Sequence, residues 1–259
     1  MGNVTRTFQF TPEQAFDLFR LQGLANDAMS TDWRTSTNNE IAYYRASYVE
    51  AAEALQSYGY KWWKKETPNE FHVKMELIDI LHFVISDELR DFYKEIERQG
   101  IELTDTDRVN SLMAEHATLY FNEWYSTHHL FEDTLEEATV QSLIDQFMYD
   151  TLENLQGSWP MLALLFEKLE MSPNAVYGFY VGKNVLNRFR DEFGQKEGKY
   201  HRTWHEGLDD NDVLINHIVD SDREGKTLTE ESIYTFLKEL YAVVLEKHYN
   251  TTMEAVLGD

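Results

Sequence analysis

Four acidic side chains occur in two pairs whose members are three residues apart. Glu50 and Glu53 form the first pair, and Glu76 and Asp79 form the second. On a helix each residue advances about 100°, so residues three apart lie about 60° from each other on one face. Four buried carboxylates cannot all remain ionised unless cations neutralise them. Because oxygen-only ligand sets select Mg²⁺ or Mn²⁺ over zinc, the pairs predict a divalent-metal site.

The segments that carry these pairs have the pattern of two helices. We predict helices over residues 40–57 and 70–99, joined by the linker "YGYKWWKKETPNE". An apolar stripe that begins at Val73 adjoins Glu76 and Asp79, so these two acids border the buried face of the second helix. Antiparallel packing of the two helices would bring the acid pairs together.

The residues alone leave other interpretations open. The chain has 46 acidic residues, so an acid pair at helical spacing is more often part of a solvated surface. A di-iron site would need a Glu-x-x-His motif on each of two helices. Asp79 and His82 give a single Asp-x-x-His, with no counterpart beside Glu50 and Glu53. A helical binding module that holds metal only for structure is the remaining alternative.

Composition favours an all-α protein. The 259 residues include only four prolines and twelve glycines, and long segments such as "LIDILHFVISDELRDFYKEI" suit helix. We predict a multi-helix bundle that forms one domain over residues 1–259, with residues 100–173 as a helical extension or insertion. There is no cysteine, which excludes disulfides and thiolate metal sites.

Charge and hydropathy restrict the partners. The formal net charge is -23, and so acidic a surface repels phosphate backbones, which argues against nucleic-acid binding. No apolar run reaches the roughly 18 residues that a membrane span needs, so we expect a cytoplasmic protein without a membrane partner.

Both ends of the chain carry helix signals. "TPEQAFDLFRLQGLANDAM" predicts an amphipathic helix that begins after Thr11 and carries Gln22 and Asn26, four residues apart, on one face. A last helix is predicted over residues 229–248.

A basic cluster stands out in "YGFYVGKNVLNRFRDEFGQKEGKY", because the whole chain has only 23 lysines and arginines. Lys183 and Arg190 are seven residues apart, hence nearly aligned on one helix face, with Asn187 between them. Ordinary surface charge and a phosphate-binding face are both compatible with this pattern.

Taken together in their order, these motifs resemble the all-α dimeric dUTPase family of the all-α NTP pyrophosphatases. The two acid pairs, the Trp-Trp linker and "ELIDILHFVIS" carry the resemblance first. The basic cluster and "TWHEGLDDN" are similar to C-terminal motifs of the trypanosomatid and bacteriophage branch. "LQGLAN" resembles the N-terminal motif on the uracil side.

The resemblance implies a homodimeric, Mg²⁺-dependent enzyme, with Mn²⁺ as a substitute, that hydrolyses dUTP and often dUDP to dUMP. Water attacks between the α and β phosphorus atoms. Glu50, Glu53, Glu76 and Asp79 match the metal-binding acids of the family. One of the first pair, Glu50 or Glu53, would also orient and deprotonate the water.

The resemblance also implies substrate contacts. The residues that match positions around the base and sugar are Gln22, Asn26, Trp62, His82 and Phe83. The residues that match phosphate and sugar contacts are Lys183, Asn187, Arg190, Lys196 and Tyr200. Asn211 matches a position near the nucleotide. A pyrophosphatase acting on dCTP, on both dCTP and dUTP, or on a modified pyrimidine nucleotide is the enzymatic alternative.

Overall fold

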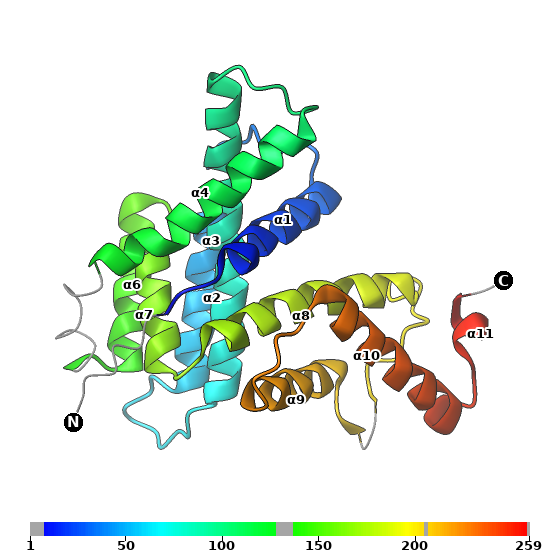
Figure 1. Cartoon of the computed structure of the whole chain (residues 1–259). Coiled ribbons are helices and arrows are strands. Elements are labelled where there is room, and N and C mark those ends of the chain that lie inside the picture. Colours follow the sequence, from blue (N-terminus) through cyan, green and yellow to red (C-terminus); the bar gives the residue numbers. More distant parts are fainter. Residues whose placement is uncertain (1–7, 128–136, 205–206, 258–259) are drawn as a thin grey trace. The chain divides into compact units, whose positions relative to one another are not determined.

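The computed structural model describes residues 8–127, 137–204 and 207–257, and it is all-α over these ranges (Figure 1). Within them there is no β-strand, only an isolated bridge between Thr203 and Asp209. None of the described helices is long and apolar enough to cross a membrane. The chain divides into two compact units, Met1–Val176 and Tyr177–Asp259, and each is described by itself. A single domain over the whole chain stays a prediction.

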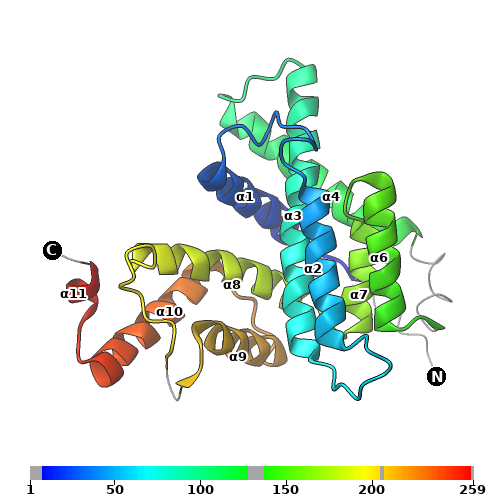
Figure 2. The same cartoon turned by 180° about the vertical axis from the view of Figure 1, so that it is seen from behind.

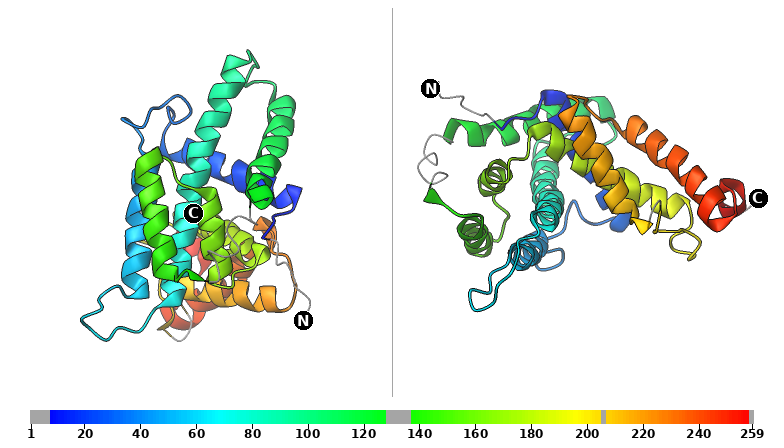
Figure 3. Two further views of the ribbon diagram at one scale, coloured as in Figure 1. Left: turned by 90° about the vertical axis from the view of Figure 1, so that its left-hand side faces the viewer. Right: turned by 90° about the horizontal axis from the view of Figure 1, so that it is seen from below.

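The first unit is built around two adjacent helices. Helix α2 (Tyr43–Tyr58) and helix α3 (Glu70–Arg98) lie side by side and run antiparallel, as Figure 2 shows. Around them pack α1 (Pro12–Met29), α4 (Thr106–Thr127), α6 (Val140–Asn154) and α7 (Trp159–Lys168). The right-hand view of Figure 3 shows α2, α3, α6 and α7 nearly end-on.

Local sequence signals explain where the first helices begin. Thr11 caps α1 in a capping box with Gln14, and Pro12 occupies the first turn. Asn69 caps α3 by accepting from the His72 backbone N–H at 3.2 Å. The predicted helices over residues 40–57 and 70–99 are thus confirmed to within a few residues.

An ion pair on α3 holds the N-terminal end of α2 and the residues before it. Arg90 pairs with Asp87 one turn earlier, and both side chains are buried. The guanidinium also donates to the Ile41 carbonyl at 2.8 Å and to Asn38 Oδ1 at 2.5 Å, and it lies over the Tyr43 ring. Burial raises the pKa of the Asp87 carboxyl to about 6, while Arg90 acts in the opposite direction. These contacts hold the start of α2 against α3.

Part of the segment 100–173 lies in the core of the first unit. Helix α6 packs against α2, and α7 packs against α3. The consecutive α7 residues from Leu162 to Phe166 are all buried. The Trp159 ring lies among Phe8, Phe10, Phe121 and Phe166. These helices therefore support the α2–α3 pair directly, because they cover its apolar sides.

The second unit contains most of α8 (Pro173–Glu192), with α9 (Asp210–Arg223), α10 (Glu230–Val244), the π-helical turn η3 (Leu245–Tyr249) and α11 (Met253–Leu257). Its core is aromatic and includes Phe189, Tyr200, Trp204 and Tyr241. The predicted helix over residues 229–248 corresponds to α10 and η3.

Candidate functional site

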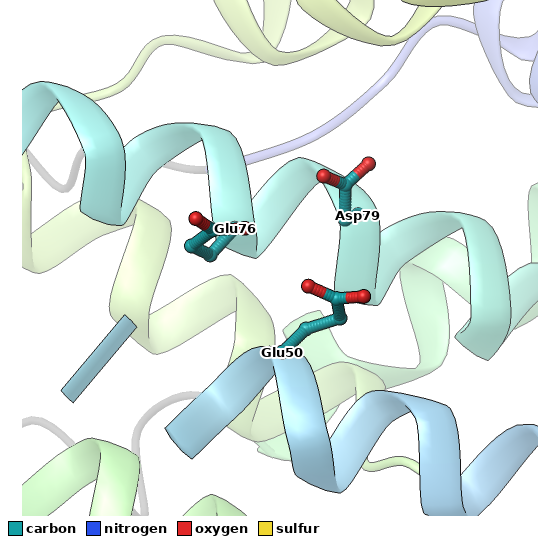
Figure 4. Close-up of side chains that lie close together, drawn as sticks. All are labelled: Glu50, Glu76 and Asp79. Carbon is teal, nitrogen blue, oxygen red and sulfur yellow. The ribbon is translucent and has the colours of Figure 1, made fainter. Parts of the chain in front are cut away.

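The α2–α3 pair brings three acidic side chains together. Glu50 reaches from α2 toward Glu76 and Asp79 on α3, as Figure 4 shows. Each contributes a carboxylate oxygen, and these oxygens lie within 4.8 Å of one another. All three side chains are half-buried. Ala51 and Ala54 on α2 are buried, and such small side chains allow neighbouring helices to approach α2 closely.

This group fits an oxygen-seeking divalent cation. Carboxylates gathered this closely repel one another unless a cation neutralises them or protons bind. Carboxylate oxygens are ligands that Mg²⁺ and Mn²⁺ accept, whereas zinc and di-iron centres commonly recruit histidine. His82 is outside the group, and its Nδ1 lies 2.8 Å from Gln22 Oε1. The donor set therefore suits Mg²⁺ better than zinc or a pair of irons.

Glu53, the fourth predicted ligand, lies outside this group. It is on α2, three residues beyond Glu50, and its side chain is exposed. The structure thus brings together Glu50, Glu76 and Asp79 and leaves Glu53 in solvent. A metal role for Glu53 stays a prediction.

Further along α3, a buried polar cluster joins α1. Gln22 Nε2 donates to Asn26 Oδ1 at 2.9 Å and to Ser86 Oγ at 2.8 Å. Its Oε1 accepts from His82 Nδ1, which places the His82 proton on Nδ1. Gln22, Asn26 and Ser86 are all buried. The helical spacing predicted the Gln22–Asn26 contact, but it did not identify Ser86, four residues after His82.

One group in this cluster has no acceptor among the residues that the structure describes. Asn26 Nδ2 is buried, and none of these residues offers it a hydrogen-bond partner. A buried unsatisfied donor costs about 1–3 kcal/mol, so a bound ligand that offers a carbonyl oxygen would recover this energy. The cluster thus combines fixed polar groups with one donor that a ligand can satisfy.

The second unit carries the predicted phosphate contacts, in different environments. Lys183 is half-buried on α8, and Asn187 is exposed one turn later. Lys196 is exposed and pairs with Asp191 at 2.9 Å. Asn211, near the start of α9, donates from Nδ2 to Asp209 Oδ1 at 2.8 Å.

Arg190 and Tyr200, by contrast, are buried and bound to one carboxylate. Arg190 donates from Nε and Nη2 to the two oxygens of Asp210, at 2.8 and 2.7 Å. The Tyr200 hydroxyl donates to Asp210 Oδ2 at 2.7 Å. Sequence reasoning missed Asp210 and predicted no helix over residues 210–223, although the aspartates at positions 209 and 210 were a usable signal for a helix N-terminus.

A comparison with known protein families identifies the family of this chain. A family model described as dUTPase matches residues 15–194. The chain belongs to the all-α dimeric dUTPase family. Among curated proteins, no sequence matches this chain.

The dUTPase match covers much of the candidate site. It includes the three gathered carboxylates and the polar cluster of Gln22, Asn26, His82 and Ser86. It ends at residue 194, so Lys196, Tyr200 and Asn211 lie beyond it. Family membership supports an enzyme of the dUTP-hydrolysing type with a nucleotide substrate, and a divalent metal is usual in the family. The predicted resemblance is therefore confirmed.

Trp62 lies in the linker, away from the polar cluster. Its side chain is 90% exposed and packs edge-on against Trp63, which is 61% exposed. The linker projects beyond the adjoining ends of α2 and α3 (Figure 1). His82 lies twelve residues into α3, about 18 Å along the axis from Glu70. Within one chain, the structure therefore does not bring Trp62 and the polar cluster together. Phe83 is half-buried beside His82.

Proposed function

We propose that this dUTPase-family protein is a Mg²⁺-dependent dUTP diphosphatase that converts dUTP, and also dUDP, to dUMP. The observation that carries the proposal is the convergence of Glu50, Glu76 and Asp79, from two helices, within 4.8 Å. A site of three half-buried carboxylates cannot bind a polyphosphate without a cation. A bound divalent metal therefore explains how so acidic a protein takes an anionic substrate.

Glu50, Glu76 and Asp79 would hold the metal. Mg²⁺ in this position supplies positive charge that neutralises the substrate phosphates and the charge that develops during phosphoryl-type transfer. Glu53, on the same helix and exposed to solvent, is available to orient a water molecule and to take its proton; Glu50 is the other candidate for this role. The water would attack one of the two phosphorus atoms of the α–β bridge and break its P–O bond to the bridging oxygen, so that dUTP gives dUMP and pyrophosphate and dUDP gives dUMP and phosphate.

The polar cluster would read the base. Asn26 Nδ2 needs an acceptor, and the O4 carbonyl of uracil provides one. His82, whose Nδ1 contacts Gln22 Oε1 in the same cluster, would lie on the side of the N3–H of uracil. Cytosine offers the opposite pattern, an amino donor at C4 and an acceptor at N3. The assigned orientations therefore favour uracil over cytosine.

The phosphates would meet cations of the second unit. Lys183 and Lys196 are the lysines that we assign to this role, and Asn187 and Asn211 are the accompanying amides. Arg190 and Tyr200 are already engaged with Asp210, so we expect them to support this surface from within. Substrate binding would then use one group of residues for metal and base and another for phosphate charge.

We further propose that the active enzyme is a homodimer in which Trp62 serves the site of the partner copy. Two adjacent, largely exposed tryptophans are unusual on a monomer surface. The linker also carries Lys61, Lys64 and Lys65, a basic segment on an otherwise acidic chain. A second copy presents the complementary acidic site.

Mixing two inactive variants tests this arrangement. Trp62→Ala and Glu76→Gln chains would be refolded together and assayed against each alone. If Trp62 acts on the partner copy, heterodimers keep one intact site and the mixture regains about a quarter of wild-type activity. If Trp62 acts on its own copy, the mixture stays as inactive as its components, and the shared-site proposal fails.

A nucleotide panel tests the activity itself. The purified protein would receive dUTP, dUDP, dCTP, dTTP and UTP with Mg²⁺, with separate detection of pyrophosphate and phosphate. We expect selective conversion of dUTP to dUMP and pyrophosphate, loss of turnover with EDTA and recovery with added Mg²⁺. A preference for dCTP would overturn the assigned orientation of the polar cluster, and turnover without metal would overturn the metal role.

A further inference from the structure

Asp210 occupies a position that connects three parts of the second unit. It is fully buried at the first residue of α9. Its carboxylate binds Arg190 of α8 through two hydrogen bonds and the Tyr200 hydroxyl through one. Its backbone N–H donates to the Arg202 carbonyl at 2.9 Å. One residue thus ties α8 and the segment 200–202 to the start of α9.

The charge state of Asp210 suits this role. Burial alone would raise the pKa of the Asp210 carboxyl, but the Arg190 guanidinium and the Tyr200 hydroxyl outweigh burial and hold that pKa below its usual value. The N-terminus of α9 also favours a negative charge at its first residue. Asp210 is therefore ionised at neutral pH and accepts from both partners.

This arrangement limits what Arg190 can do. An arginine binds a phosphate best through two parallel N–H groups on one edge. The edge formed by Nε and Nη2 is occupied by Asp210, and Nη1 lies 3.3 Å from Asn187 Oδ1. Arg190 is only 9% exposed. Arg190 therefore acts mainly as a structural partner of Asp210 within the second unit.

Exposed basic residues lie on the segment 200–202 that Asp210 holds and in the turn that leads into it. Lys196, Lys199 and Arg202 all reach solvent. The turn around Lys196 needs glycine, because Gly194 before it and Gly198 after it have φ values of 79° and 69°. Other contacts secure the same segment, since Trp204 Nε1 donates to the His201 carbonyl at 2.9 Å and the Tyr241 hydroxyl accepts from the His201 N–H at 3.0 Å.

We propose that Asp210 is a positioning residue for phosphate binding: through Tyr200 and Arg202 it sets the segment that presents Lys196, Lys199 and Arg202 to the substrate. This inference rests on the proposed function, because it assigns these cations to the nucleotide phosphates. Arg202 and Lys199 thereby join the substrate-binding residues. Asp210 itself acts through its neighbours and does not touch the substrate.

Asp210→Asn tests the positioning role. The asparagine places an N–H₂ donor where the Arg190 or Tyr200 donors point, so at least one hydrogen bond is lost. The matched control is Asp220→Asn, because Asp220 is an exposed aspartate on the same helix that pairs with Arg223 at 3.5 Å. We expect the KM for dUTP to rise about tenfold in Asp210→Asn, with kcat within about threefold of wild type, and neither to change in the control. A fall in kcat at unchanged KM would overturn the proposal.

Limited trypsin digestion of the native protein gives a readout that needs no substrate. Trypsin cleaves after Lys196, Lys199 and Arg202, so the rate of cleavage there reports how firmly the segment is held. We expect about tenfold faster cleavage in Asp210→Asn than in wild type or Asp220→Asn, with cut sites assigned by mass spectrometry. Equal rates would show that Asp210 does not fix the segment, whatever the enzyme hydrolyses.

A milder variant keeps the test usable if Asp210→Asn does not fold. Tyr200→Phe removes one hydrogen bond to Asp210 but leaves the Arg190–Asp210 pair and the aromatic packing on Tyr241 in place. We expect cleavage faster than wild type and a smaller rise in KM. If the proteolysis result holds while no nucleotide is hydrolysed, the proposed function fails and the anchoring by Asp210 stands. If Tyr200→Phe matches wild type in both measurements, the positioning role is refuted.

Discussion

The two acidic centres of this protein are built in opposite ways. On α2 and α3, three carboxylates from different turns point at one another. At the start of α9, one buried carboxylate is surrounded by the donors of Arg190 and Tyr200. Like charges brought together are costly to fold and become favourable when a cation binds. A carboxylate enclosed by donors is satisfied without any ligand. The first arrangement fits the metal site that we propose, and the second is an internal support.

This contrast predicts different results for neutralising an acid in each place. In the α2–α3 group, removal of a charge should abolish metal-dependent activity and leave the fold in place. At Asp210, it should weaken the fold and affect activity only through substrate binding. Variants at each place therefore test whether the two acidic centres differ in this way.

The largest effect is expected for Glu76→Gln. Loss of one ligand from a three-carboxylate site should lower Mg²⁺-dependent dUTP hydrolysis by at least about a thousandfold. Mg²⁺ should raise the Tm of the wild type, because it binds the folded state, and should no longer raise that of the variant. Pyrophosphate release and thermal unfolding with and without Mg²⁺ measure the two effects.

Asp91→Asn is the matched control for Glu76→Gln. Asp91 is an exposed acid on the same helix, paired with Lys94 at 3.5 Å. We expect this variant to keep both turnover and the Mg²⁺-dependent rise in Tm. If Glu76→Gln retained both as well, the α2–α3 group would be an ordinary acidic surface.

Glu53→Gln separates the catalytic role from the metal-binding role in the α2–α3 group. We expect hydrolysis to be abolished, with a loss of at least about a hundredfold, and the helical fold to be unchanged, because a general base contributes on this scale. Since Glu53 lies outside the gathered group, the Mg²⁺-dependent rise in Tm should survive in this variant. Full turnover would remove Glu53 from the mechanism, and loss of the Tm response would make it a metal ligand.

More of the α2–α3 acidic group than of the Asp210 cluster could be predicted from the sequence. Helical spacing predicted the two helices that carry the acid pairs, and antiparallel packing was the arrangement that would bring all four acids together. The structure has the antiparallel pair and gathers Glu50, Glu76 and Asp79. Spacing along one helix does not fix the side-chain direction relative to a partner helix, so the exposure of Glu53 was not predictable. The place of Asp210 depends on contacts across 10 and 20 residues of sequence, which no local pattern encodes.

Asp210→Asn should give a moderate loss of stability that depends on pH. Removing one partner from a buried ion pair leaves Arg190 uncompensated, at a cost of about 3 kcal/mol at pH 7. Because the folded pKa of Asp210 lies below its usual value, the stability from its charge is fully present above the unfolded pKa of about 3.9. It is lost as the pH falls through the folded pKa.

The free energy of unfolding of wild type and Asp210→Asn, measured by urea titration from pH 7 to pH 3, checks this sign. The difference between the two proteins should stay constant down to about pH 5 and narrow below about pH 4. A difference that widens as the pH falls would mean that Asp210 is protonated in the folded protein, and the distinction between the two centres would fail.

The smallest effect is expected for Lys196→Ala. Lys196 makes a surface ion pair with Asp191. Such pairs contribute about 0–1 kcal/mol, so the unfolding free energy should stay within about 0.5 kcal/mol of wild type. As one of several cations that meet the phosphates, Lys196 should still matter for substrate, with a KM for dUTP raised about threefold at low salt and less at high salt. If the KM for dUTP changed with neither the substitution nor the salt concentration, Lys196 would be an ordinary surface charge. The phosphate contact would then rest on Lys183, Lys199 and Arg202.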